Sequence, residues 1–332
     1  MKLSTQGKRI RPLILFGPTA VGKTALTSKL FNNLTELISA DSMQFYKEAS
    51  IGTAKPTKEE LSAFTYHLID FLDPRKSFTS RQFIERVNFL VPQIIARGHL
   101  PLISGGTAYY LKQYIEGPSI APKTDMALAT KLSNKLKESD AKTPPNCESP
   151  YRQELYNKLC EVDQVSASKI HINDSYRLVR AIECFLTNGR PLSSFKVDSK
   201  SYDIDKLVVV GIKLDREILY RRINDRVDKM IQMGLVEEVK GLLNSGYDFD
   251  TPVMRGIGYQ EFSSYQTVNG HYEKRELLQI IDKIKQHSRN YAKKQLTFFS
   301  TIKNVFWFDA NDFDGLYAFL LKMGYGDFLC SK

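Results

Sequence analysis

The segment Gly17-Pro18-Thr19-Ala20-Val21-Gly22-Lys23-Thr24 constrains this chain more than any other part of the sequence. It fits the phosphate-loop pattern G-x-x-x-x-G-K-[ST], in which glycines turn backbone N–H groups toward an anion at the start of a helix. The apolar run 13–16 precedes it and a helical stretch, 25–34, follows it, as the pattern requires. Lys23 supplies a positive charge, and the Thr24 hydroxyl is a candidate Mg²⁺ ligand. The loop predicts a bound polyphosphate and leaves open whether this is a nucleotide such as ATP.

Further short apolar runs alternate with helical patterns along the chain. They lie at 37–40, 100–103, 207–210 and 305–308. This alternation is typical of parallel βαβ units with helices on both faces of the sheet. We therefore predict an α/β fold, namely a phosphate-loop NTPase-like parallel sheet flanked by helices.

The composition changes between residues 118 and 206, where lysines, prolines and short amphipathic helical patterns dominate. We interpret this stretch as an inserted all-helical domain. The α/β core would then comprise residues 1–117 and 207–332, with helices at its C-terminal end. A chain of 332 residues is long enough for two units at about 150 residues each.

The overall composition excludes a chain that is disordered throughout, because 42% of the residues are hydrophobic and 11% are aromatic. No apolar stretch approaches the ~18 residues of a membrane span, and no signal-peptide core is present. The 4 cysteines form no CxxC pair and have no histidine at zinc-ligand spacing, which favours reduced thiols. We expect a monomeric cytoplasmic protein with no membrane partner.

The net charge is +10, which favours a polyanionic partner such as nucleic acid, although many soluble proteins carry such a surplus for solubility alone. Lys285, Arg289 and Lys293 follow one line of the helical pattern 280–299, with aromatic residues between them. Basic and aromatic residues at this spacing suit phosphate contacts on RNA, and a surface helix with one core edge has a similar pattern.

Two polar segments follow predicted strands. Asp41 comes directly after the run 37–40, and Gly105-Gly106-Thr107 closely follows the run 100–103. The carboxyl ends of parallel strands share one edge, so both segments should lie beside the phosphate loop. There Asp41 would either ligate Mg²⁺ or accept a proton, or it would only cap the next helix. The spacing alone does not decide between these roles.

The helix predicted from Asp215 onward carries a cationic line on a different face from its core stripe, Leu219, Ile223, Val227 and Met230. Arg222, Arg226 and Lys229 are spaced at i, i+4 and i+7. Such a line is usually a solvated face, but an arginine directed at a pyrophosphate would stabilise a leaving group.

Taken in order, these motifs resemble the bacterial type of the tRNA dimethylallyltransferase (tRNA isopentenyltransferase) family. The resemblance covers about residues 10–310, and its motifs are the phosphate loop followed by 41–46, 51–56, 67–70, 105–107, 170–183, 222–230, 256–259 and 289–295. It departs from the family at Glu48, where glycine is common, at Phe298, where tryptophan is common, and at Ala129 and Ser300, where arginine is expected.

The resemblance implies transfer of a dimethylallyl group from dimethylallyl diphosphate to N6 of the adenosine 3′ of the anticodon in tRNA, with release of diphosphate. It implies that Asp41 is the general base, that Thr107 positions the base or the diphosphate, and that Arg226 stabilises the departing diphosphate. The loop 17–24 would hold the diphosphate with Mg²⁺ at Thr24. Because the amine of a stacked base is unreachable, the adenosine would be flipped out of the anticodon stem-loop.

Contacts with tRNA are expected from the strand-end segments, the insertion, a late loop and the basic helix. The residues are Asp41, Ser42, Met43, Gln44, Thr107, Tyr176, Arg177, Leu178, Val179, Arg180, Arg255, Gly256, Ile257, Gly258, Tyr259, Gln260, Lys285, Arg289 and Lys293.

Three other functions remain open at this point. A small-molecule phosphate-loop kinase would use Asp41 to position an acceptor hydroxyl. A non-catalytic RNA-binding protein would retain the loop without a reaction. An adenylate isopentenyltransferase would modify a free nucleotide and would not need a basic surface.

Overall fold

The computed structural model describes residues 10–118, 120–144, 147–195, 207–265 and 272–331. The chain divides into two compact units, an α/β core from Met1–Glu116 and Tyr202–Lys332 and a helical unit, Gly117–Ser201. Among the helices of the described residues, none combines the length and the apolar character of a membrane span.

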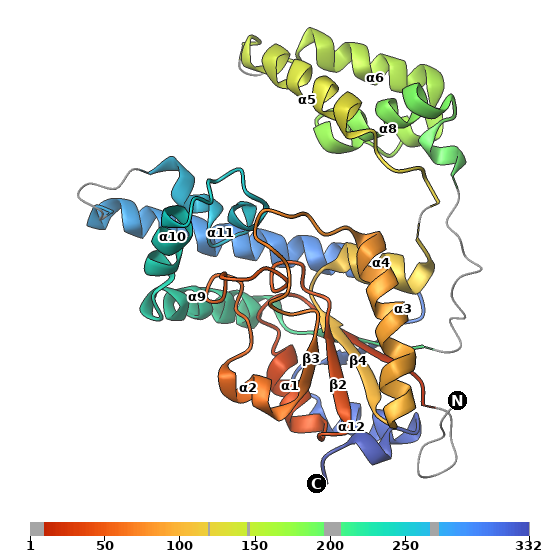
Figure 1. Cartoon of the computed structure of the whole chain (residues 1–332), viewed down its shortest axis with the longest axis vertical. Coiled ribbons are helices and arrows are strands. Elements are labelled where there is room, and N and C mark those ends of the chain that lie inside the picture. Colours follow the sequence, from red (N-terminus) through yellow and green to blue (C-terminus); the bar gives the residue numbers. More distant parts are fainter. Residues whose placement is uncertain (1–9, 119, 145–146, 196–206, 266–271, 332) are drawn as a thin grey trace. The chain divides into compact units, whose positions relative to one another are not determined.

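The core is built on a 6-stranded sheet in which every pair of neighbouring strands is parallel. The strand order is β3-β2-β4-β1-β5-β6 (Figure 1). The strands are β1 Leu13–Phe16, β2 Thr35–Ser39, β3 Thr65–His67, β4 Leu100–Gly105, β5 Val208–Lys213 and β6 Phe306–Asp309. The predicted α/β fold is therefore confirmed.

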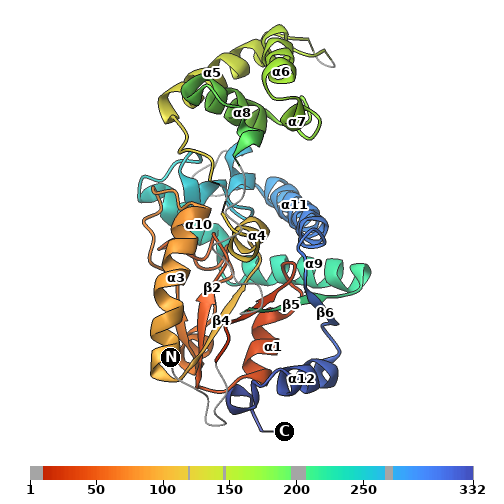
Figure 2. The same cartoon turned by 90° about the vertical axis from the view of Figure 1, so that its right-hand side faces the viewer.

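Successive residues of a strand point to opposite faces of the sheet, and helices pack on both faces. Leu13 and Leu15 pack with α1, Lys23–Leu30, and α12, Phe313–Lys322. Ile14 and Phe16 pack with α3, Ser80–Arg97, and α4, Ala108–Glu116. Figure 2 shows α3 on one side of the strands and α1 with α12 on the other.

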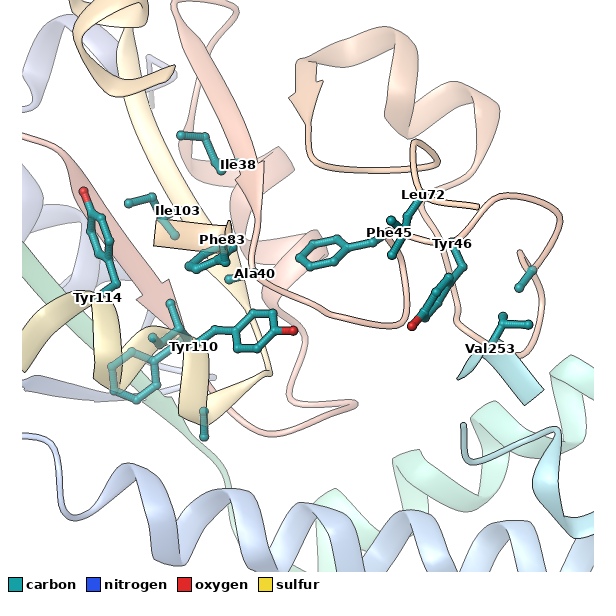
Figure 3. Close-up of a cluster of buried hydrophobic side chains, with 14 of the residues drawn as sticks. Ile38, Ala40, Phe45, Tyr46, Leu72, Phe83, Ile103, Tyr110, Tyr114 and Val253 are labelled. Carbon is teal, nitrogen blue, oxygen red and sulfur yellow. The ribbon is translucent and has the colours of Figure 1, made fainter. Parts of the chain in front are cut away.

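The α3 side of the core also holds the loop that follows β2. Figure 3 shows Ile38, Ala40 and Ile103 of the strand region near Phe83, with Phe45 on the adjoining loop. The rings of Phe45 and Phe83 are stacked with centroids 6.4 Å apart, and both residues are fully buried. This packing fixes the backbone just after Asp41.

The remaining core helices are α2 Lys58–Ala63, α9 Arg216–Gln232, α10 Leu235–Asn244 and α11 Lys274–Phe299, with 3-10 turns at Pro252–Arg255, Gln260–Ser264 and Gly326–Phe328. In Figures 1 and 2, α9 and α11 run side by side at one end of the sheet. An ion pair of 2.6 Å between Lys285 and Asp228 joins these two helices.

Two helix boundaries differ from the prediction. The helix after the phosphate loop ends at Leu30, because Phe31 forms a bridge with Leu329 and the chain turns toward the C-terminal segment. The basic helix starts at Lys274, where Glu273 and Glu276 form a capping box.

The helical unit consists of α5 Met126–Ala141, α6 Pro150–Val162, α7 Gln164–Ala167 and α8 Ser175–Asn188, with a 3-10 turn at Leu192–Ser194. Leu136, Leu159 and Leu178 form part of its apolar core. The free cysteines Cys147 and Cys160 are exposed and Cys184 is buried.

Candidate active site

The phosphate loop lies between β1 and α1, and its glycines meet specific steric demands. A Cβ on Gly17 would lie 2.7 Å from the carbonyl oxygen of Ile212, so no side chain fits there. Gly22 has a φ of 103°, a left-handed conformation that glycine adopts without strain. Ala20 has a φ of 61° despite its side chain, so contacts elsewhere must hold this part of the loop.

Lys23 is half-buried at the start of α1, and its ammonium group contacts the phosphate loop. Its Nζ donates to the carbonyl oxygens of Gly17 and Pro18, both at 2.9 Å. Burial lowers the pKa of Lys23 to about 8; Asp41 opposes this shift and Arg226 adds to it. The lowered pKa means that the protein alone stabilises the Lys23 charge poorly. A bound anion would stabilise this charge, so the site favours anion binding.

Thr19, in the middle of the loop, is held by two helices. Its N–H donates to Oε1 of Gln295 on α11 at 2.9 Å, and its Oγ1 accepts from Nη1 of Arg226 on α9 at 3.2 Å. Arg222 on α9 donates to the carbonyl oxygen of Val21 at 3.2 Å. The loop is thus fixed against α9 and α11.

Asp41 lies just beyond β2, at the carboxyl end of the sheet. Its Oδ1 accepts from the N–H of Met43 at 3.1 Å, so it does cap its own loop. Burial raises the pKa of Asp41, against the lowering effects of the Met43 N–H, Lys23 and Arg226. A carboxylate whose pKa is raised toward neutral pH is a stronger general base.

Thr107 joins the ends of β2 and β4. Its N–H donates to the carbonyl oxygen of Ala40 at 3.0 Å, and its Oγ1 accepts from the N–H of Ser42 at 2.9 Å. Gly105 packs directly against the backbone of Ala40, where a side chain would not fit. As the sequence predicts, Asp41 and Thr107 lie at one edge beside the phosphate loop.

Two cavities meet at this edge. One, of about 580 Å³, is lined by the phosphate loop and by charged side chains that include Lys23, Arg222 and Lys229. The other, of about 300 Å³, is lined by apolar side chains of α9 and α11, including Ile223 and Ile284. Both are lined by Thr19, Asp41, Arg226 and Tyr291. The site therefore fits a molecule with a polyanionic end and an apolar end, joined where Asp41 lies.

The donor set for a metal is sparse. Within the described ranges, no group of three or more His, Cys, Asp and Glu side chains is placed to hold a metal ion. Thr24, which is exposed, and Asp41, which is half-buried, both line the polar cavity. Mg²⁺ suits such a site, because it is usually bound by one or two protein oxygens together with substrate phosphates.

The predicted RNA-contacting loops have different environments. Ser42, Met43 and the segment 256–258 line the apolar cavity, and Gln44 lines the polar one. Arg255 and Gln260 are exposed. Tyr259 is fully buried, and its hydroxyl donates to Glu238 at 2.7 Å. A contact from Tyr259 would therefore have to come from its backbone.

Three residues of the basic helix α11 are predicted to contact RNA, and two of them have partners within the protein. Lys285 pairs with Asp228, and Nη1 of Arg289 donates to Asn224 at 2.6 Å, both partners being on α9. Lys293 is exposed. RNA contacts from this helix remain a prediction, which the structure favours most at Lys293.

The helical unit presents only part of the predicted segment to solvent. Leu178 and Val179 are buried in its core, and Arg180 pairs with the fully buried Glu183. Tyr176 is 81% exposed, and the side chain of Arg177 is exposed while paired with Asp174. Side-chain contact with RNA is therefore expected from Tyr176 and Arg177.

Sequence reasoning missed Tyr291 and Gln295 as site residues. Gln295 is 3% exposed and falls on the same buried stripe of α11 as Ala292 and Phe299. A polar residue on an apolar helix stripe was the available signal, since a buried amide needs hydrogen-bond partners.

The departures from the family have local explanations in part. Glu48 has a φ of 67°, where glycine is favoured, and its carboxylate accepts from the Tyr247 hydroxyl at 2.9 Å. Phe298 contacts the ring of Tyr109. Nothing in the structure explains Ala129 or Ser300.

Comparison with known proteins gives a consistent result. A family model described as IPP transferase matches residues 44–302. The tRNA dimethylallyltransferase of Acetivibrio thermocellus is 39% identical over 304 residues, which cover 91% of this chain and 92% of that protein. The tRNA dimethylallyltransferase of Staphylococcus carnosus is 39% identical over 303 residues, which cover 90% of each chain.

Solved structures are similar along most of the chain. The full-length tRNA isopentenylpyrophosphate transferase from Bacillus halodurans has a TM-score of 0.63 and 34% identity, covering 95% of this chain and 96% of that one. A eukaryotic dimethylallyltransferase described as acting on tRNA has a TM-score of 0.67 and 25% identity, covering 95% of this chain and 77% of that one.

Proposed function

The chain belongs to the IPP transferase family, and from this premise we propose that it transfers a dimethylallyl group from dimethylallyl diphosphate to N6 of the adenosine 3′ of the anticodon in tRNA. The supporting observation is that Asp41 lines both the polyanion cavity and the apolar cavity. A prenyl diphosphate has the matching form, an anionic end and a small apolar end.

The donor is proposed to bind across the junction of the cavities. Its diphosphate would lie against the loop 17–24, where backbone N–H groups and Lys23 balance its charge. Its dimethylallyl group would enter the apolar cavity, which excludes water from the reacting carbon. Arg226 lines both cavities, so it is placed to stabilise charge on the oxygen that departs.

The acceptor is proposed to approach the same carbon from the side of Asp41. N6 forms a bond to C1 of the dimethylallyl group while the C1–O bond breaks, and the electron pair of that bond leaves with the diphosphate. The extra proton on N6 passes to the Asp41 carboxylate. Thr107 would act by fixing the backbone at Ser42, next to the base.

Mg²⁺ would be held by Thr24 together with the diphosphate oxygens, and it would supply charge neutralisation at the leaving group. The protein is proposed to act in the cytoplasm as a monomer. Residues of a single chain line both cavities, so a second subunit is not needed to complete them. The partner is the anticodon stem-loop of tRNA, with the target adenosine flipped out of its stack.

Label transfer tests this proposal. The protein is incubated with Mg²⁺, labelled dimethylallyl diphosphate and either an anticodon stem-loop or AMP. Label on the stem-loop adenosine alone is expected. Label on AMP alone would indicate a free-nucleotide enzyme, and stem-loop binding without label transfer would indicate an RNA-binding protein. Phosphate transfer from ATP to a small molecule would indicate a kinase.

A further inference from the structure

We propose that Gln295 is a positioning residue that sets the phosphate loop relative to the segment that follows β4, which lies beside the general base Asp41. Within the described residues, its side chain bonds the two segments directly. The inference rests on the proposed function only in that the bound anion is a diphosphate.

Both halves of the Gln295 amide are used. Oε1 accepts the N–H of Thr19 at 2.9 Å, and Nε2 donates to the carbonyl oxygen of Gly106 at 2.7 Å. The residue is 3% exposed, so neither bond is exchanged readily with water. A buried amide that loses one such partner leaves an unsatisfied polar group behind, and this cost keeps the two segments in register.

The loop needs this support. Ala20, the residue after Thr19, has a φ of 61°, which a residue with a Cβ adopts only when its surroundings enforce it. Arg226 holds only the Thr19 side chain, so the Gln295 bond is the one that fixes the Thr19 peptide on the side of α11. The direction of the following N–H groups toward an anion depends on that peptide.

The amide must also be neutral. A Cβ placed on Gly106 would lie 2.7 Å from Nε2 of Gln295 and 3.9 Å from Oδ2 of Asp41, so both groups flank one point. A carboxylate at position 295 would lose the donor to Gly106. It would also add negative charge beside Asp41 and the diphosphate, which raises the pKa of a neighbouring carboxyl.

The test uses Gln295→Met, which keeps the volume, and Gln295→Glu, which keeps the acceptor. Gln286→Ala is the matched control, because Gln286 lies on α11, is exposed and lines neither cavity. Binding of inorganic pyrophosphate with Mg²⁺ is measured by calorimetry, stem-loop affinity by anisotropy, and the pH dependence of the single-turnover rate by quenching.

Gln295→Met is expected to bind pyrophosphate about tenfold more weakly, since it removes two hydrogen bonds, with stem-loop affinity unchanged. Gln295→Glu is expected to bind pyrophosphate more weakly still and to shift the acid limb of the rate profile to higher pH. A lowered melting temperature with unchanged pyrophosphate affinity and pH profile in both variants would overturn the inference. Because pyrophosphate binding needs no RNA, this result is separate from failure of the proposed transfer reaction.

Discussion

Lys23, Asp41 and Arg226 are half-buried ionisable side chains that line the same cavity. Burial lowers the pKa of Lys23 to about 8, raises that of Asp41 and lowers that of Arg226. Each shift disfavours the charged form of the free protein. A bound diphosphate reverses the shifts of the two cations, so ligand affinity and pH are coupled at this site.

Pyrophosphate affinity is expected to fall as the pH rises above about 8, because the free protein then loses the Lys23 charge. Lys23→Met is expected to bind weakly at every pH. Pyrophosphate itself also titrates in this pH range, but this effect is the same for both proteins and cancels in the ratio of their affinities. Calorimetry from pH 7 to about 9.5 checks this, and a constant ratio of the two affinities would contradict it.

Arg226→Ala is expected to slow the single-turnover transfer about 10²–10³-fold, because it removes charge stabilisation at the leaving group. Its affinity for the stem-loop should not change. Arg221→Ala, an exposed change on the same helix outside both cavities, is the control. A large loss of stem-loop affinity in Arg226→Ala with a normal transfer rate would assign Arg226 to RNA binding.

At the scale of elements, the sequence predicts the strands that are apolar runs and misses the strand that is not. β1 is predicted at its observed bounds, since Leu13–Phe16 is wholly apolar and buried on both faces. β3 has no such pattern, because Thr65, Tyr66 and His67 lie at the edge of the sheet and stay partly exposed. The strand ends also predict that Asp41 and Thr107 share one edge, but no pattern in the sequence places α11 against the phosphate loop.

A second charged cluster holds β2 to its neighbours. Glu36 on β2 accepts from Arg97 at the end of α3 and lies 2.7–2.8 Å from nitrogens of His67 and His99. Burial alone would raise the pKa of Glu36, but the hydrogen bonds from Arg97 and the histidines lower it to about 2.

Glu36→Gln is expected to lower the free energy of unfolding at pH 7 by roughly 1–3 kcal/mol, since it removes charge-assisted hydrogen bonds. The folded pKa lies below the ordinary value of 4.5, so the wild-type advantage is complete above pH 4.5 and disappears as the pH falls toward 2. Chemical denaturation of the wild type and of Glu36→Gln across this pH range measures the difference in their free energies of unfolding. Glu85→Gln, at an exposed ion pair, should change stability by less than about 0.5 kcal/mol, and an equal effect of both would contradict the role of Glu36.

At the scale of the whole molecule, the surplus of positive charge predicts a polyanionic partner but not which side chains meet it. The sequence predicts Arg180, Lys285 and Arg289 at RNA phosphates, yet each has a partner within the protein. Helical spacing places residues on one line of a helix. It does not tell whether that line meets solvent or another helix.

The salt dependence of stem-loop affinity separates these cases. Log K should fall linearly with log salt, and Lys293→Ala should flatten the slope by somewhat less than one unit if it removes a single bond to phosphate. Lys285→Ala should leave the slope unchanged and lower the melting temperature, since Lys285 pairs with Asp228. The opposite pattern would place Lys285, and not Lys293, at the RNA.

In the proposed reaction, Asp41 takes the proton from N6 where the two cavities meet. The most direct test is the single-turnover rate of label transfer from dimethylallyl diphosphate to an anticodon stem-loop by Asp41→Asn. We expect a rate lower by ~10²–10⁴-fold. Stem-loop affinity should be nearly unchanged and stability at pH 7 should not fall, because burial raises the pKa of Asp41 and makes its charge unfavourable to folding. A rate equal to that of the wild type would exclude Asp41 as the base.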